Sequence, residues 1–261
     1  LVPSLGPGLV PLSGRDVPST PGELAERLTK RAAVPGRIRN NLWSAAQYIQ
    51  THRHRKTLDL LMAEAFAEGP AVTPLHTWLA GLDNLPLVID VWYDGTMPAA
   101  LSRAGRRDWA QVQGVSRASF QTQDRWWRVF DSSGAEADDT TADLARTLVY
   151  APHGAIRPAG QVLISDSDYV EVLTEIDIQT PIPPAVDARR RGRGLLFVGC
   201  RFDDQMLRTF ARQIAKRMDG PHHAVVEHDI NRNEERFLAD ELGAEIHRMP
   251  LAALAGTPSA G

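Results

Sequence analysis

The chain has 261 residues, of which 43% are hydrophobic and 23% are charged, and its formal net charge at pH 7 is -3. This composition is ordinary for a globular protein and excludes a chain that is disordered throughout. The small negative charge gives no reason to expect binding to nucleic acid or to an anionic membrane. A single cysteine, Cys200, excludes an internal disulfide framework and any metal site built from several cysteines, so we expect no metal cofactor. No apolar run reaches the roughly 18 residues of a membrane-spanning helix, and we expect a cytoplasmic protein.

The first third of the chain predicts one strand followed by helices. Residues 1–5 are a short apolar run that ends at a Gly-Pro-Gly turn and predict a strand. A helix is predicted over 21–33, because Thr20 is a suitable N-cap, a proline suits the first helical position, and apolar residues recur on one face. Apolar stripes predict two further helices within 37–68 and a short one over 74–81.

From residue 85 onward the pattern changes to apolar strands separated by helices. Strands are predicted over residues 87–92, 126–130, 162–164, 195–198, 224–227 and 245–248, with another ending at 149–150, and helices over 204–218 and 233–242. This alternation is typical of parallel βαβ units. It predicts an α/β fold, a Rossmann-like, doubly wound and mainly parallel sheet with a helical module inserted between its first two strands. We assign residues 1–20 and 85–250 to the Rossmann-type domain, 21–84 to the helical module and 251–261 to a flexible tail.

Two loops follow strands at the edge where such sheets bind ligands. Gly6, Gly8 and Gly14 follow the first strand, and glycines let backbone N–H groups approach a phosphate closely; a plain tight turn explains the first two equally well. His153 follows the strand that ends at 149–150, and an imidazole can change its charge near neutral pH. The alternative for His153 is a turn-capping role beside Gly154.

Five segments in a defined order carry a resemblance to a known family. They are the glycine loop, Leu87 to Asp94 (LVIDVWYD), Tyr150 to Gly154 (YAPHG), Gln161 to Tyr169 (QVLISDSDY) and Leu195 to Asp204 (LLFVGCRFDD). In sequence and in order they resemble the motifs of the SIR2-like, sirtuin-related family. The resemblance implies that NAD is a candidate cofactor and that His153 is the candidate catalytic base toward the nicotinamide ribose. The cofactor-binding residues that it implies are Gly6, Gly8, Gly14, Trp92, Asp94 and Gly199.

Departures from the family pattern bear on activity. Trp92 stands where the family has its catalytic Asn, and an indole has one donor and no acceptor with which to position water or ribose. Val10 replaces a small hydroxyl residue, and Pro7 removes a backbone donor from the glycine loop. One cysteine cannot form the four-cysteine zinc module of the protein deacylases. Turnover of NAD by the family mechanism is therefore not expected.

The sequence thus favours an accessory or regulatory protein with a degenerate nucleotide cleft that acts by binding a protein partner. SIR2-like frames also lie beside nitrogen-fixation genes, so the resemblance includes a larger, nitrogenase-related complex among the partners. The alternatives are an NAD hydrolase of the SIR2-like antiphage type and a nucleotide sensor.

Candidate partner-binding residues lie outside the regular alternation of strands and helices. They are Trp109, Trp126 and Trp127 in the irregular segment 103–130, and Arg189, Arg190 and Arg191 in an arginine-rich helix. Tryptophan and arginine are the residues that most often dominate the energy of an interface. The alternatives are that the tryptophans complete the core and that the arginines form a solvated helix end.

Two segments that contain histidine have ordinary interpretations. The basic run from His52 to Lys56 separates two predicted helices and is interpreted as a solvated turn. His222 and His223 open a predicted strand without a Cys, Asp or Glu constellation near them in the sequence, which argues against a metal site.

Overall fold

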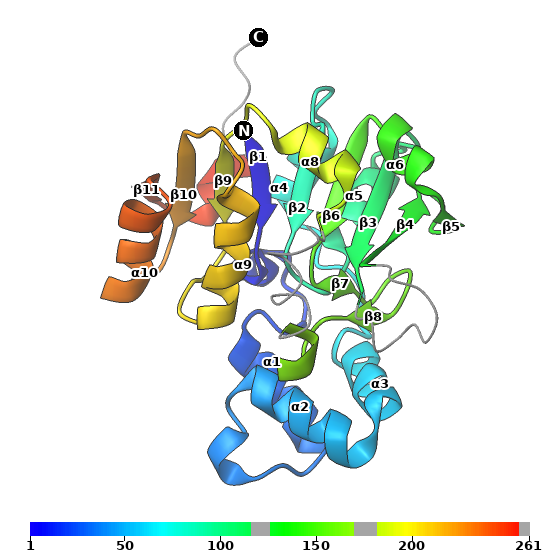
Figure 1. Ribbon diagram of the computed structural model, residues 1–261, viewed down its shortest axis with the longest axis vertical. Coiled ribbons are helices and arrows are strands. Elements are labelled where there is room, and N and C mark those ends of the chain that lie inside the picture. Colours follow the sequence, from blue (N-terminus) through cyan, green and yellow to red (C-terminus); the bar gives the residue numbers. More distant parts are fainter. Residues whose placement is uncertain (116–125, 170–181, 256–261) are drawn as a thin grey trace.

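The computed structural model of the protein describes residues 1–115, 126–169 and 182–255 (Figure 1). Within these residues, nine strands form one sheet in the order β11-β10-β9-β1-β2-β6-β3-β4-β5. The strands are β1 (Val2–Leu5), β2 (Leu87–Asp90), β3 (Trp109–Gly114), β4 (Trp127–Asp131), β5 (Glu136–Ala137), β6 (Thr147–Ala151), β9 (Leu195–Val198), β10 (His222–Val226) and β11 (Ala244–Arg248). A separate two-stranded pairing joins β7 (Gly154–Ala155) to β8 (Gln161–Val162).

The sheet is parallel except at one edge. β1 lies between β9 and β2 and runs parallel to both, and the parallel pairing continues through β6 and β3 on one side and through β10 and β11 on the other. Among the described strands of this sheet, β4 pairs in the antiparallel sense with both of its neighbours, β3 and β5. The chain first builds the sheet outward from β1 toward β2 and later returns to add β9 on the opposite side. The doubly wound Rossmann-like fold expected from the sequence is confirmed, and its switch point lies between β1 and β9.

The described helices begin and end close to their sequence signals. They are α1 (Pro21–Arg31), α2 (Leu42–Arg53), α3 (Arg55–Ala65), α4 (Pro74–Ala80), α5 (Thr96–Arg103), α6 (Asp139–Leu144), α8 (Pro184–Arg190), α9 (Gln205–Ala215) and α10 (Arg232–Arg236). Short irregular helical turns are η1 (Pro7–Ser13), η2 (Gly36–Ile38), η4 (Phe237–Glu241) and η5 (Leu251–Ala255). Thr20 caps α1 by accepting a hydrogen bond from the Glu23 amide, as its position predicts. None of the helices in these described ranges is long and apolar enough to cross a membrane.

Helices cover both faces of the sheet and also its carboxyl edge (Figure 1). α1, α2 and α3 lie beyond the carboxyl ends of the strands, and their buried residues join one core with Ile89 and Phe197 of the sheet. This core continues over one face of the sheet, and a second core lies on the other face, where Leu75 and Leu79 of α4 pack with Val88. The expected helical module extends to residue 84 and so includes α4. In the structure, α4 packs against this second face together with α5 and η5.

Several local expectations are corrected by the structure. Residues 162–164 do not add a strand to the main sheet, because only β8 is extended there and it pairs with β7. Residues 116–125 of the expected irregular segment 103–130 lie outside the described residues, but its first part contains β3, a regular strand inside the sheet between β6 and β4. The start of the expected flexible tail is folded, since η5 places Leu251 at 3% exposure in the second core; residues 256–261 lie outside the described residues.

Candidate active site cleft

The cleft opens at the switch point of the sheet, between the carboxyl ends of four neighbouring strands and α9. Its volume is about 580 Å³, counting the part that opens to solvent. The described residues that line it are Ser4, Pro7, Pro21, Val91, Trp92, His153, Phe197, Cys200, Arg201, Phe202, Leu207, Phe210, Ala211 and Ile214. Parallel strands deliver their following loops to one edge, which is why residues so distant in sequence meet here. Among them, Arg201 carries the single permanent charge, and the walls are otherwise mainly apolar.

Trp92 closes the cleft at the end of β2. Its side chain is 5% exposed, and the indole Nε1 donates a hydrogen bond to the Pro18 carbonyl oxygen at 2.9 Å. The ring also packs against Tyr93 with a centroid separation of 5.1 Å and edge-on against Phe66 of the segment after α3 at 6.1 Å. The one polar group of the indole is thus used to hold the loop before α1.

His153 lies at the end of β6 inside an apolar and aromatic environment. It is 2% exposed, its Nδ1 is 2.9 Å from the Tyr169 hydroxyl, and its ring centroid is 4.4 Å from that of Phe210. Tyr169 in turn donates to the Leu163 carbonyl oxygen at 3.1 Å, so the hydroxyl accepts from His153. Burial lowers the pKa of His153 to about 3 because the charged imidazolium would lose its solvation. The imidazole is therefore neutral at physiological pH and a weak acceptor for a proton.

A buried ion pair fixes the segment that carries Tyr169. Arg55, the first residue of α3, donates from one guanidinium nitrogen to both carboxylate oxygens of Asp168 at 2.9 Å. Asp168 is 1% exposed and also accepts from the amides of Ile164 and Ser165. The basic run that we interpreted as a solvated turn therefore contributes Arg55 to the inside of the molecule. This contact joins the helices beyond the strand ends to the wall of the cleft.

The glycine loop after β1 packs against the loop after β9. The amide of Gly6 donates to the Val198 carbonyl oxygen and that of Gly8 to the Gly199 carbonyl oxygen, both at 2.9 Å. A Cβ atom on Gly6 would lie 2.4 Å from the Gly199 oxygen, and one on Gly8 would lie 2.8 Å from it. Gly199 itself has φ of 67°, the left-handed conformation that favours glycine. Two of the amides that we expected to face a phosphate are thus used inside the fold.

The remaining predicted cofactor residues are divided between the cleft wall and other places. Gly6, Trp92 and Asp94 line a smaller cavity on the other side of the indole. Gly8 and Gly199 lie where the glycine loop contacts the loop after β9, and neither is among the described lining residues of either cavity. Gly14 ends η1 with φ of 68°, and a Cβ atom at this position would meet no described atom within 4 Å. Trp92 therefore lines both cavities, with His153 in the cleft and with Asp94 in the smaller one.

A second buried carboxyl group, which the sequence analysis missed, lies in the smaller cavity. Asp90 ends β2, is 5% exposed and accepts from the amides of Trp92 and Met97 at 3.4 Å each. Burial raises its pKa to about 8, and the nearby Asp94 adds to this rise; burial also raises the pKa of Asp94. The signal in the sequence is an acidic residue that ends an otherwise apolar strand. Two buried carboxyl groups so close together favour retention of a proton by Asp90.

The polar groups of the β9 loop are also engaged within the protein. Arg201 forms a two-pronged ion pair with Glu234 at 2.9 and 3.1 Å, and Glu234 is 1% exposed. Glu234 accepts a further hydrogen bond from the Phe202 amide at 3.0 Å. The Cys200 thiol lies 3.3 Å from the Ser4 carbonyl oxygen, and burial raises its pKa to about 12. A neutral thiol is a poor nucleophile, so Cys200 contributes packing to the cleft.

The family of the protein follows from comparison of its sequence with known families. The sequence model of the SIR2-like domain matches residues 86–245, more than half of the chain. The chain belongs to the SIR2-like family. No curated protein matches it. The family resemblance drawn from the ordered motifs is thereby confirmed, and the match covers Trp92, Asp94, His153 and Gly199, whereas the glycine loop lies before its first residue.

The three candidate tryptophans of this SIR2-like protein do not form an exposed surface. Trp109 is 6% exposed and Trp126 is 7% exposed, and each belongs to one of the two cores. Trp127 is half-buried, packs against the core, and donates from its Nε1 to Asp139 at 2.9 Å. The expectation that these three residues anchor a partner is wrong for Trp109 and Trp126, because folding of the chain already removes them from solvent.

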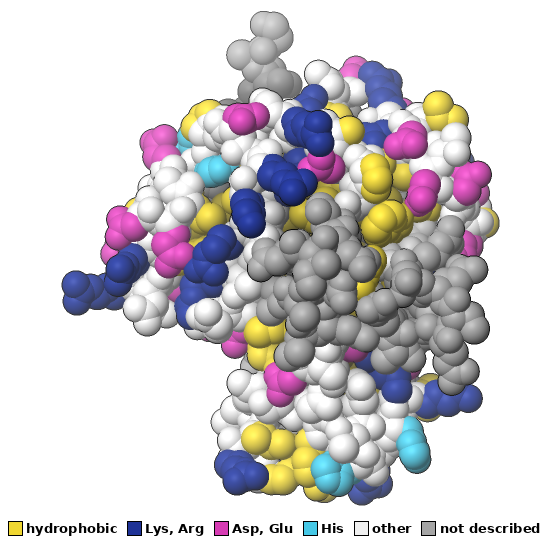
Figure 2. All heavy atoms as spheres, in the orientation of Figure 1, with side chains coloured by type: hydrophobic (Ala, Val, Ile, Leu, Met, Phe, Trp, Pro, Cys, Tyr) yellow, Lys and Arg dark blue, Asp and Glu magenta, His cyan; other side chains and the backbone are white. Residues whose placement is uncertain are grey.

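The arginines of α8 also serve the fold. Arg190 is 1% exposed, pairs with Asp187 at 2.7 Å and donates to the Ile214 carbonyl oxygen at 2.7 Å. Arg189 donates to the Asp143 and Ala145 carbonyl oxygens at the end of α6. Of the three, Arg191 alone has an exposed side chain, 69%, and it pairs with Asp187. Figure 2 shows Lys and Arg side chains in a band over α8 and along α9, but Arg190 is not available to a partner and is corrected to a structural residue.

The structure brings His223 close to two metal-ligating residues that lie far from it in the sequence. β10 and β11 pair in parallel with His223 opposite Glu245 and Val225 opposite His247. Side chains alternate between the faces of a strand, so His223, Glu245 and His247 share one face. The argument against a metal site at His223 is therefore wrong, because it considered neighbours in the sequence and these residues are neighbours in space. His222 points to the opposite face, where its Nδ1 accepts from the Leu195 amide at 3.0 Å.

Proposed function

We propose that this SIR2-like protein acts by binding and not by cleaving NAD, as an accessory or regulatory component of a protein partner. The observation that carries the proposal is the position of Trp92. Its buried indole occupies the wall of the cleft where the family pattern has an Asn, and its single donor is held by the Pro18 carbonyl oxygen. A side chain with no remaining polar group cannot orient water or a ribose hydroxyl.

The environment of His153 supports the same conclusion. A general base works best when its pKa is near the operating pH, whereas burial lowers the pKa of His153 to about 3. Its Nδ1 contact is the Tyr169 hydroxyl, which is uncharged at neutral pH and cannot stabilise an imidazolium as a carboxylate does. The histidine is thus better suited to holding the wall of the cleft than to accepting a proton from substrate.

The lining of the cleft indicates the kind of ligand. Phe197, Phe202 and Phe210 offer aromatic surface, while Arg201 is already paired with Glu234 and two glycine-loop amides donate within the fold. We propose that the cleft binds a flat, weakly polar group, such as the base of a nucleotide, and that NAD is a candidate on this account. A protein that binds a ligand in this cleft without converting it can act only through a second molecule that responds to the bound ligand. This is the reason to propose a protein partner, and a larger enzyme complex is one such partner.

The decisive experiment measures nicotinamide release from NAD by the purified protein and by His153→Ala. A positioned acid–base group contributes about 10²–10⁴-fold to a rate, so a working histidine would be evident. We expect no difference between the two proteins, and the same result for His52→Ala, a control that removes an exposed histidine from α2. Release that disappears only in His153→Ala would overturn the proposal and favour the NAD hydrolase.

A second experiment separates an accessory protein from a nucleotide sensor. The protein is purified under mild conditions from its own cells, and the proteins that remain with it are identified and quantified. A partner at a fixed stoichiometry is the expected result. A single chain that binds NAD, releases no nicotinamide and retains no other protein would favour the sensor.

A further inference from the structure

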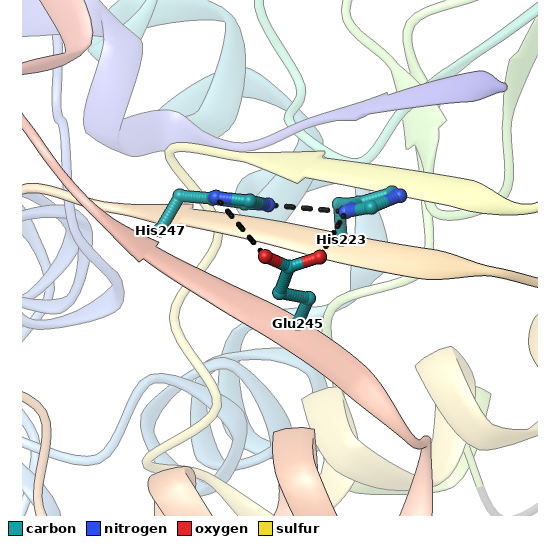
Figure 3. A group of neighbouring side chains, drawn as sticks. All are labelled: His223, Glu245 and His247. Carbon is teal, nitrogen blue, oxygen red and sulfur yellow. Dashed lines mark hydrogen bonds and ion pairs between the residues drawn. The ribbon is translucent and has the colours of Figure 1, made fainter.

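The open edge of the sheet carries a cluster of three side chains that is separate from the cleft. Figure 3 shows His223 on β10 and Glu245 and His247 on β11 with their polar atoms turned toward one another. His223 Nδ1 is 3.0 Å from His247 Nε2 and 3.6 Å from a carboxylate oxygen of Glu245. One ligand atom from each residue can be chosen so that all three lie within 4.8 Å of one another. The cluster follows from the register of the two strands, because β11 pairs with β10 along its full length.

We infer that this cluster is a binding site for a divalent transition-metal ion, with Zn²⁺ as the ion that fits its donors best. Two imidazole nitrogens and one carboxylate oxygen are a donor set that zinc accepts, with a fourth position left to water. Zn–N bonds of about 2.0–2.1 Å place two nitrogens of a tetrahedral site about 3.3 Å apart. His223 Nδ1 and His247 Nε2 are 3.0 Å apart, so a small rotation of either ring opens the space that the ion needs.

The exposure of the three side chains suits an ion that enters from solvent. Exposed fractions are 22% for the His223 side chain, 38% for His247 and 68% for Glu245. The two imidazoles are therefore partly buried, which limits their movement, while the exposed carboxylate can move to complete the site. Without an ion, one N–H lies between His223 Nδ1 and His247 Nε2. When the ion takes its place, that proton moves to the other nitrogen of its own ring, so that both imidazoles are neutral ligands.

The site would strengthen the end of the sheet. β11 is the edge strand of the described sheet and pairs with β10 alone. An ion held by one residue of β10 and two residues of β11 would connect the strands through their side chains in addition to the backbone ladder. A ligand that binds only the folded chain stabilises it according to its concentration relative to Kd. The inference is independent of the proposed function, because the cluster shares no residue with the cleft.

The experiment uses untagged full-length protein freed of metal with a chelator that is then removed. Zn²⁺ is titrated by calorimetry, and thermal unfolding is followed with and without Zn²⁺ at 100 times the measured Kd. We expect one ion per chain and a rise in Tm of roughly 5 °C or more. Co²⁺ provides a second readout, because an ion with four ligands absorbs visible light more strongly than a hydrated ion.

Variants assign the ion to this cluster. His223→Ala and His247→Ala should each weaken Zn²⁺ binding by more than about 100-fold, beyond the 10–100-fold that loss of an outer partner costs. Glu245→Gln keeps the size of an exposed side chain, so it should fold normally while weakening binding and changing the Co²⁺ spectrum. His52→Ala is the matched control and should bind as the wild type does.

Two outcomes would overturn the inference. The first is the absence of binding at one ion per chain in the wild type. The second is binding that persists unchanged in the folded Glu245→Gln variant and in either histidine variant, because the ion would then be held elsewhere on the protein.

Discussion

Replacement of Gly6 by alanine tests whether the glycine loop serves packing. The Cβ atom of an alanine at this position would lie 2.4 Å from the Gly199 carbonyl oxygen and 2.7 Å from the Cys200 Cα. Both contacts are with backbone, so no side-chain rotation can relieve them. The Gly6 amide also donates to the Val198 carbonyl oxygen at 2.9 Å, which holds the end of β1 against the end of β9. Gly6→Ala must therefore push these two strand ends apart or strain them.

The size of the effect follows from this overlap. Forcing an extra methyl group into a well-packed region typically costs about 1–3 kcal/mol. For a chain of this size, each kcal/mol lowers Tm by about 2–4 °C, so we expect a fall of roughly 2–12 °C. Gly22→Ala is the matched control, because its Cβ would have Thr20 Oγ1 as nearest neighbour at 3.9 Å in the first turn of α1. That change should raise stability by about 0.4–1 kcal/mol, since it restricts the unfolded chain.

Thermal and urea unfolding followed by circular dichroism measure both variants against the wild type. A Gly6→Ala protein that melts with the wild type would refute the reasoning, because the loop would then be free to move away from β9. Its amides would in that case be available to a phosphate, as the family resemblance implies. Equal losses in Gly6→Ala and Gly22→Ala would also contradict the explanation, since they would reflect the loss of glycine and not contact with Gly199.

Two further predictions concern buried charged groups. Asp90→Asn should make the free energy of unfolding depend less on pH. In the folded wild type, the pKa of Asp90 is raised from 3.8 to about 8, so between these pH values the folded protein holds a proton that the unfolded chain releases. This stabilisation is complete below pH 4 and is lost toward pH 8 at up to about 1.4 kcal/mol per pH unit. Urea titrations at several pH values measure the unfolding free energy of both proteins, and the same change with pH in wild type and variant would contradict the prediction. Arg190→Met should cost about 1–3 kcal/mol, because the buried Ile214 carbonyl oxygen loses its donor while Asp187 keeps its pair with Arg191. Arg191→Ala, at an exposed position, should change stability by less than about 0.5 kcal/mol, and similar urea midpoints would show that Arg190 is not structural.

The helices and most parallel strands could be predicted because their signals are local. Thr20 and the proline after it set the start of α1, and the apolar runs that became β2 and β9 are continuous in the sequence. β3 was missed because Gln111 and Gln113 interrupt its apolar pattern. Both are buried in the sheet, and Gln113 donates to the Arg157 carbonyl oxygen at 2.7 Å. A polar side chain can occupy an interior strand when another part of the chain supplies its partner.

The roles of Trp126 and Arg190 could not be inferred from their residue types. Tryptophan and arginine are common at interfaces, but they also fill interiors when a partner for their polar atoms is present. For Arg190, that partner includes the Ile214 carbonyl oxygen near the end of α9, 24 residues along the chain. Burial depends on how helices and strands pack together, which a local pattern does not specify.

The sequence by itself determined the family, the doubly wound sheet and the edge at which Trp92 and His153 meet, because parallel strands place their carboxyl ends together. Tertiary structure alone decided which groups remain available there: the amides of Gly6 and Gly8 are used by the loop after β9. It also decided the cluster of His223, Glu245 and His247, whose members have no characteristic spacing. They meet because the register of two neighbouring strands fixes which side chains lie opposite one another, and register is set by the packing of the whole sheet.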